Sequence, residues 1–297
     1  MKTDTADSAD PIIQRLRTLW QESPHLKDAA GVYEAILPLI RDADVHVEAI
    51  SLTPAEAFAK MEKGLPLLYD IGLELDGQSV MELMLRIAGA VEKLRENEPS
   101  LSQVRSSDEL GMKARLIRLA LEEKTLDVDE LLPVVAAGER EILASVAQGL
   151  RLDAGLLWIL SQNALKPALR AWRRQLTPIV EGISWYRGTC FVCGADATLG
   201  ELQGNNQFKH LRCVQCGADW PFRRLECMYC ANEDHTTLGY LYPESQRERP
   251  RVEVCEKCKG YLKVITTFSA TPAEMLPVED LATLHLDYIA QERGYVR

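Results

Sequence analysis

Along the first part of the chain, from residue 11 to about residue 180, hydrophobic positions recur with the period of an amphipathic helix. Between Ile12 and Leu19 they are spaced three and four apart, which places them on one helical face. Thr53-Pro54-Ala55-Glu56 has the pattern of a capping box with proline at the first helical position, so a helix is expected there. Similar spacing predicts helices over residues 25–41, 79–95, 138–152, 153–165 and 167–180, with others beginning near Ser107 and after Asp127. No strand alternation or fixed repeat precedes Ser184, so this part is expected to be all-α.

Near Gly182 the pattern changes to short runs that are typical of β-strands. Eleven of the nineteen aromatic residues lie between Trp185 and Phe268. The runs cover residues 208–212, 220–225, 238–242, 252–254 and 261–268, and Gly204-Asn205-Asn206 and Pro243-Glu244-Ser245 have the composition of hairpin turns. A helical turn is then expected from Thr271 to Pro277. Residues 278–292 are predicted to form a final helix with Leu281, Leu284, Tyr288 and Ile289 on its buried face.

All eight cysteines lie in this second part, in four pairs that are each separated by two residues. A two-residue gap lets both thiolates of a tight turn bind one ion, and two such turns complete a tetrahedral site of four sulfurs. Four turns therefore predict two metal sites. The ligands would be Cys190, Cys193, Cys213, Cys216, Cys227, Cys230, Cys255 and Cys258.

Loop lengths favour sites that are formed by consecutive turns. Nineteen residues separate Cys193 from Cys213 and twenty-four separate Cys230 from Cys255, each enough for a hairpin, whereas only ten separate Cys216 from Cys227. We therefore pair the first turn with the second and the third with the fourth, with interleaved pairing as the alternative. The predicted architecture is α plus small β: an all-α domain over 1–182, two tandem rubredoxin-like or zinc-ribbon modules over 183–226 and 227–270, and a C-terminal helical segment over 271–297.

The residue after each turn differs between the two predicted sites. Gly194 and Gly217 follow the turns of the first site, and glycine takes a positive φ without steric cost. Ala231 and Lys259 follow those of the second, which is therefore expected to be less regular and more labile. His210 and His235 are close enough in sequence to replace a cysteine ligand, although polar hairpin positions are the favoured interpretation.

Four thiolates close the coordination sphere and leave no position for water or substrate, which is typical of structural metal sites. Zinc and iron both accept this ligation, and spacing does not distinguish them. Elsewhere the chain has no glycine-rich phosphate loop, no nucleophile elbow, and no carboxylate at a catalytic spacing from histidine, serine or cysteine. The sequence therefore predicts a protein that is not an enzyme.

Charge and composition narrow the choice of partners. The net charge is −10, and residues 184–268 hold eleven Lys or Arg against ten Asp or Glu before any thiolate is counted. Nucleic-acid-binding ribbons usually have a basic surface, so this balance argues against a nucleic-acid partner. Residues 1–11 are polar and acidic, and no apolar run is long enough to span a bilayer, which predicts a cytoplasmic protein without membrane insertion. In that reducing compartment, metal explains eight cysteines better than disulfides.

The cysteine-containing part resembles the family of the formate dehydrogenase accessory protein FdhE. The resemblance lies in Phe208-Lys209-His210-Leu211-Arg212 before Cys213, in Leu225-Glu226 before Cys227, in Gly260-Tyr261-Leu262-Lys263 after Cys258, and in Asp280-Leu281-Ala282-Thr283-Leu284-His285-Leu286-Asp287 with Gly294-Tyr295. The helical half agrees in length and character. Phe191 and Lys259 depart from the family's frequent proline and glycine, and neither departure removes a ligand. The resemblance also implies that the chain ends before the family's usual C-terminal tail.

What the resemblance implies is a cytoplasmic maturation factor for molybdenum- or tungsten-containing formate dehydrogenases that contacts the catalytic subunit. It also favours iron over zinc in two rubredoxin-like sites. The alternative is a rubredoxin-like redox protein, since iron held by four thiolates can pass one electron during assembly of the client enzyme. A nucleic-acid-binding zinc ribbon is the third interpretation, and the sequence is silent on self-association.

Overall fold

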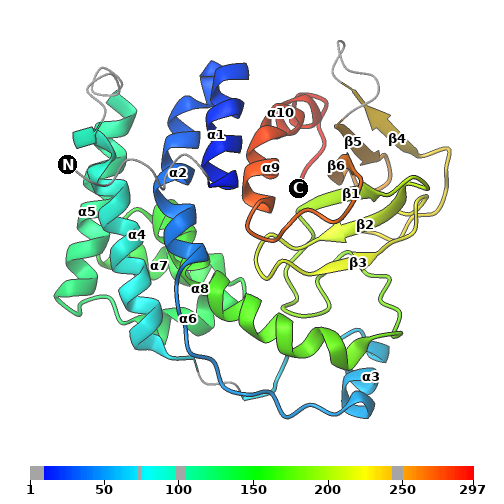
Figure 1. The fold of residues 1–297 in the computed structure, drawn as a ribbon, viewed down its shortest axis with the longest axis horizontal. Coiled ribbons are helices and arrows are strands. Elements are labelled where there is room, and N and C mark those ends of the chain that lie inside the picture. The colour runs from blue at the N-terminus through cyan, green and yellow to red at the C-terminus, as the bar shows by residue number, and fades with distance from the viewer. Residues whose placement is uncertain (1–9, 73–74, 98–104, 243–249) are drawn as a thin grey trace. The chain divides into compact units, whose positions relative to one another are not determined.

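The computed structural model describes residues 10–72, 75–97, 105–242 and 250–297 (Figure 1). The chain divides into two compact units. The first comprises Met1–Glu48 and Glu74–Ala171, and the second comprises Ala49–Leu73 and Trp172–Arg297. The finer sequence division into 1–182, 183–226, 227–270 and 271–297 stays a prediction. The predicted turn at Pro243-Glu244-Ser245 lies outside the described residues.

The first unit is helical, as the hydrophobic spacing predicted. Its elements are α1 (Pro11–Glu22), η2 (Pro24–Leu26), α2 (Lys27–Arg41), α4 (Gly77–Asn97), α5 (Arg105–Glu122), α6 (Val128–Ala136), α7 (Arg140–Gly149) and most of α8 (Ala154–Leu176). Asp10 and Asp127 cap α1 and α6, since their carboxylates accept hydrogen bonds from the amides of Ile12 and Asp129, both at 2.9 Å. Helix α2 packs against α1 and α4, and α4 packs against α5 (Figure 1).

Helix α8 continues through Pro167, so the prediction of separate helices over 153–165 and 167–180 is wrong. An internal proline removes one backbone hydrogen bond and costs about 3 kcal/mol. Ala164, Leu165 and Ala168 beside it are all buried. Packing of both halves on one apolar face therefore outweighs the local penalty. The helix is followed by η4 (Thr177–Val180).

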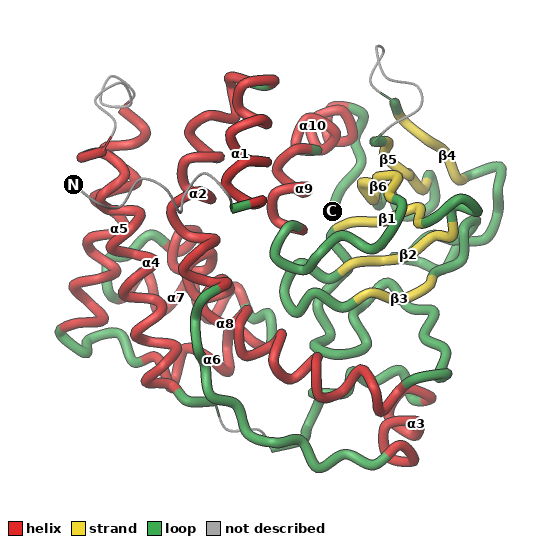
Figure 2. Tube along the Cα trace, in the orientation of Figure 1, coloured by secondary structure: helices red, strands yellow, loops and turns green. Residues whose placement is uncertain are grey.

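The second unit contains a six-stranded sheet (Figure 2). Its strands are β1 (Leu199–Gln203), β2 (Phe208–Arg212), β3 (Asp219–Pro221), β4 (Leu238–Leu241), β5 (Arg251–Cys255) and β6 (Tyr261–Thr267), in the order β3-β2-β1-β6-β5-β4. Neighbours within each three-strand half are antiparallel. β1 and β6 pair in parallel, with Gly200 opposite Val264. That pair joins both cysteine-containing halves into one sheet.

Strand β1 was not predicted from the sequence. It contains glycine at position 200 and a charged residue at position 201, neither of which favours a buried strand. Glu201 is nevertheless fully buried, because Arg212 on the neighbouring strand donates to it at 2.6 Å. Four of the other strands lie close to their predicted positions, whereas β3 ends at Pro221, so the strand predicted over 220–225 is wrong beyond that residue.

Two C-terminal helices, α9 (Leu276–Ala282) and α10 (Leu284–Glu292), replace the single helix predicted over 278–292. Pro277 is the second residue of α9 instead of ending a turn. Helix α10 packs on β5 and β6, where Leu286 and Ala290 meet Val252, Val254 and Tyr261. Tyr288, predicted to be buried, is 59% exposed, because the break at Thr283 rotates the helix that follows.

The second unit also takes residues 49–73 from the first half of the sequence. Thr53 and Glu56 form the predicted capping box at the start of α3 (Pro54–Glu62). The amides of Leu67 and Leu68 donate to the carbonyls of Phe191 and Val192 at 2.8 and 3.0 Å. This segment therefore lies directly against the first cysteine turn, which the sequence pattern did not indicate.

Candidate metal centres

The four turns bring the eight cysteines into two groups of four, and within each group all Sγ atoms lie within 4.8 Å of one another. The first cysteine group is Cys190, Cys193, Cys213 and Cys216, and the second is Cys227, Cys230, Cys255 and Cys258. The first turn thus joins the second and the third joins the fourth. This is the grouping that loop length favoured, and the interleaved alternative is wrong.

Sulfur separations fit tetrahedral ligation. The Sγ atoms are 3.5 Å apart for Cys190 and Cys216, 3.6 Å for Cys193 and Cys213, 3.6 Å for Cys227 and Cys258, and 3.8 Å for Cys230 and Cys255. Four sulfurs at about 2.3 Å from one ion stand roughly 3.8 Å apart, whereas bonded cystine sulfurs are about 2.05 Å apart. None of the eight cysteines forms a disulfide. Each group could therefore hold one metal ion, and four soft sulfur donors suit zinc and iron alike.

The same backbone conformation recurs in all four turns. The first cysteine of each turn accepts, through its carbonyl, a hydrogen bond from the amide four residues on, at 2.8–2.9 Å, and its own amide donates to the carbonyl five residues on, at 2.7–3.0 Å. The residue after the second cysteine is left-handed each time: φ is 80° at Gly194, 76° at Gly217, 53° at Ala231 and 59° at Lys259. The expectation that the second site is less regular is therefore wrong in its backbone geometry.

Replacing Ala231 by glycine is expected to stabilise the second unit by about 1 kcal/mol, since glycine adopts a positive φ without a Cβ clash. Ala195→Gly is the matched control. Ala195 follows the first turn and is not among the residues with positive φ, so glycine there should destabilise through unfolded-state entropy. Chemical denaturation of both metal-loaded variants measures the difference. Equal destabilisation by the two substitutions would contradict the strain assigned to Ala231.

The two groups differ in exposure. Three of the four cysteines in the first group are buried, whereas Cys230 and Cys258 of the second are both partly exposed. Phe191 and Trp220 stack edge to face beside the first group, with ring centroids 6.2 Å apart. Asn232 donates to Cys255 Sγ at 3.6 Å in the second. Solvent and reagents therefore reach the second group more readily.

Thiol acidity is uneven within each group. Burial raises the pKa of Cys190 and Cys216, whereas hydrogen bonds from neighbouring thiols lower that of Cys213. Burial also raises the pKa of Cys227 and Cys258. At Cys255 burial acts in the same direction, but backbone amides and the Asn232 side chain outweigh it and lower the pKa to about 7. A bound cation would favour ionisation of every ligand, because the thiolate is the form that coordinates.

Neither histidine considered as a ligand belongs to a sulfur group among the described residues. His210 lies on β2, and its Nδ1 is 2.6 Å from Asp219 Oδ1 on β3. Burial acts to raise the pKa of Asp219, but the hydrogen bond with His210 holds it below the usual value. His210 therefore links β2 to β3 through Asp219. Among the described residues, the eight cysteines are the candidate metal ligands.

Buried ion pairs hold the sheet and the C-terminal helices together, and sequence reasoning missed them. Lys263 on β6 is 1% exposed, and its Nζ lies 2.7 Å from both Asp280 on α9 and Asp287 on α10. Lys209 on β2 reaches Glu253 on β5 at 2.6 Å. Lys263 could have been recognised in the sequence as a lysine within a mostly apolar strand. Asp280 and Asp287, two helical turns apart in the C-terminal helical segment, were its potential partners.

Comparisons with known proteins find similarity to FdhE proteins. Residues 225–297 match the model of the FdhE C-terminal domain. FdhE homologues are 29% identical over 116 residues in Aquifex aeolicus, 35% over 111 in Stutzerimonas stutzeri and 31% over 181 in Edwardsiella ictaluri. These alignments cover 38%, 36% and 58% of this chain and 40%, 35% and 56% of the relatives, so the chain spans about a third to a little over half of their length.

The fold has a solved counterpart. The crystal structure of the FdhE protein from Pseudomonas aeruginosa matches with a TM-score of 0.58 and 22% identity, over 96% of this chain and 91% of that one. The resemblance inferred from the residues around the cysteines is confirmed. Among the described residues, no single helix is long and apolar enough to cross a membrane; Arg140–Gly149 and Ala154–Val180 meet the criteria only when taken together across a bend.

Proposed function

Taking the resemblance to FdhE as the premise, we propose that this protein is a cytoplasmic accessory factor for the maturation of a formate dehydrogenase. In this proposal it binds the catalytic subunit, and it is not itself an enzyme. The observation that carries the proposal is the pair of four-sulfur groups within a sheet whose second half matches the FdhE C-terminal domain. A closed sulfur tetrahedron stabilises a fold and offers no vacant position to a substrate.

We propose that all eight cysteines ligate two metal ions, one in each group. The bound ions would supply cross-links between the turns and, in the case of iron, a one-electron couple. The chain's own contribution is to fix four sulfurs at tetrahedral separations and to direct N–H groups toward them. The amides of Val192 and Gly260 lie 3.4 Å from the sulfurs of Cys190 and Cys258. Iron is favoured by the family resemblance, and zinc fits the same sulfurs.

A redox role in assembly is the second candidate, and the partial exposure of Cys230 and Cys258 favours it. An electron-transfer partner needs close approach to the metal, and the second group permits this better than the first. Visible absorption of anaerobically purified protein distinguishes the two functions. Reversible Fe(III)-thiolate bands support redox chemistry, whereas two zinc ions per chain and no visible bands exclude it.

Deleting the gene tests the accessory function. Formate dehydrogenase activity is expected to fall to background in the deletion strain, while another molybdenum enzyme of the same cell keeps its activity as the control. The purified protein should bind the purified catalytic subunit in a direct binding assay. Unchanged formate dehydrogenase activity in the deletion strain, or no binding to the subunit, would contradict the proposal.

A further inference from the structure

We propose that the outer edge of β4, which no other described strand pairs with, is the docking site for an extended, acidic segment of the client polypeptide, which adds a strand to the sheet. The inference rests on the proposed function for the identity of that client. The recognition chemistry itself comes from the backbone of β4, the groove beside it and one exposed arginine.

The two outer strands of the sheet, β3 and β4, differ in how their edges are protected. The amide of Phe222 donates to the Lys209 carbonyl at 2.9 Å. Hydrogen bonding alternates along antiparallel strands, so the backbone groups of Asp219 and Pro221 point away from β2, toward the outer edge of β3. Proline has no amide hydrogen to offer a further strand. The β3 edge is therefore blocked.

Within the described part of the chain, the β4 edge has no such protection. The amide of Glu256 donates to the Thr237 carbonyl at 2.9 Å, which sets the alternation between β4 and β5. Gly239 and Leu241 then face β5, and Leu238 and Tyr240 direct their N–H and C=O groups outward. Strand β4, with the sequence Leu-Gly-Tyr-Leu, contains neither a charge nor proline. The outward N–H and C=O groups of Leu238 and Tyr240 could therefore hydrogen-bond to an extended polypeptide that pairs with β4 as a further strand.

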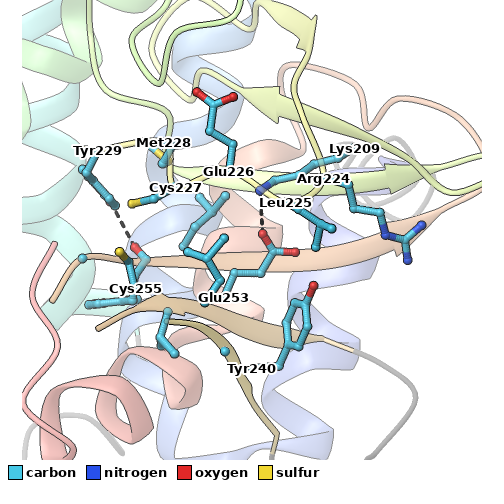
Figure 3. A pocket seen from close by; sticks show the side chains of 16 residues that line it. Lys209, Arg224, Leu225, Glu226, Cys227, Met228, Tyr229, Tyr240, Glu253 and Cys255 are labelled. Atoms are coloured by element: carbon cyan, nitrogen blue, oxygen red, sulfur yellow. Dashed lines mark hydrogen bonds and ion pairs between the residues drawn. The ribbon is translucent and has the colours of Figure 1, made fainter. Parts of the chain in front are cut away.

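A groove continues from this edge across the sheet face opposite α10 (Figure 3). It measures about 400 Å³, part of it open to solvent, and it is lined by Leu238, Tyr240 and Leu225 among others. Tyr240 is 41% exposed and Leu225 is 56% exposed. The ion pair of Lys209 with Glu253 lies within the groove. Alternate side chains of an added strand would rest on these apolar surfaces.

One cation of the groove favours an acidic segment, since the other charged residues that line it, Lys209, Glu226 and Glu253, take part in ion pairs. Arg224 lines it and is exposed, and among the described residues it forms no ion pair; its one hydrogen bond is a long one of 3.5 Å to the Gln207 carbonyl. Arg223 beside it is already paired with Glu226 and Glu233. A second copy of the chain would bring another β4 without a carboxylate, together with another Arg224. Charge complementarity therefore favours a client segment over self-pairing.

The test uses Leu238→Pro, which removes one outward N–H and leaves the bonds of Gly239 and Leu241 to β5 in place. Proline is tolerated at the first residue of an edge strand. Leu238→Ala is the matched control, because it keeps the N–H and shortens the side chain. Binding to the purified catalytic subunit of a formate dehydrogenase is expected to weaken about tenfold or more for Leu238→Pro, and about threefold or less for Leu238→Ala. Arg224→Glu should also weaken binding, with a smaller salt dependence.

Hydrogen exchange of the wild-type protein provides the second measurement. The amides of Leu238 and Tyr240 should exchange more slowly when the catalytic subunit is bound, and this readout holds even if the proline variant loses stability. Subunit binding that survives Leu238→Pro unchanged, or leaves those amides unprotected, overturns the docking site and leaves the proposed function standing. No binding by the wild-type protein overturns both. A wild-type dimer that Leu238→Pro dissociates assigns the edge to a second copy and also overturns the inference.

Discussion

Replacing Cys213 by serine is expected to remove metal from the first cysteine group and to unfold the entire sheet of the second unit. Tandem modules would unfold separately, but the parallel pair of β1 with β6 makes each half a neighbour of the other. Structural zinc sites contribute roughly 10–16 kcal/mol, which is as large as the stability of a typical domain. Metal analysis and hydrogen exchange across residues 199–267 measure the loss.

The matched control is Gln215→Ser, which lies in the same turn and leaves all four sulfurs in place. Helical circular dichroism from the first unit should persist in Cys213→Ser, because that unit has its own buried residues on α1, α2, α4 and α5. Two results would count against this prediction. One is full loss of the helical signal, and the other is continued protection of β4, β5 and β6 when the first group is empty.

Replacing Lys263 by methionine is expected to destabilise the second unit by about 3 kcal/mol, the lower end of the usual cost of removing one partner of a buried ion pair, because Arg297 still pairs with both carboxylates. Lys263 Nζ lies 2.7 Å from both Asp280 and Asp287, and Asp287 also accepts from the Tyr261 hydroxyl at 2.8 Å. Without the ammonium group, the buried Asp287 keeps only the guanidinium of Arg297, at 3.2 Å, as a cationic partner. Denaturant titration of the metal-loaded protein measures the change.

Lys259→Met is the control for the same chemical change at a surface position. Lys259 is about half exposed and pairs with Glu256 one turn away, so its loss should cost at most about 1 kcal/mol. Adding Asp287→Asn to Lys263→Met should restore part of the stability, because it removes a buried charge that has lost its nearest cation. Equal effects of the two lysine substitutions, or no recovery in the double variant, would show that the buried pair is not the cause.

Features that depend on neighbours in the sequence were predictable. Thr53 and Asp127 cap helices because a short polar side chain reaches amides two or three residues away. The four cysteine turns are equally local, and the loop lengths between them sufficed to assign both groups. The sequence did not foresee that Ala231 and Lys259 repeat the left-handed conformation of Gly194 and Gly217. The backbone hydrogen bonds that close each turn recur with that conformation whatever the residue.

By itself, then, the sequence determined the helical character of the first unit, the candidate ligands and their grouping, because each follows from side-chain chemistry within a short stretch of chain. Tertiary structure alone decided the pairing of β1 with β6, the contact of Leu67 and Leu68 with the first cysteine turn, and the burial of Lys263. It also left the β4 edge open while Pro221 closes the other. These features join residues that are distant in sequence, and their free energy comes from packing and ion pairing that no local pattern encodes.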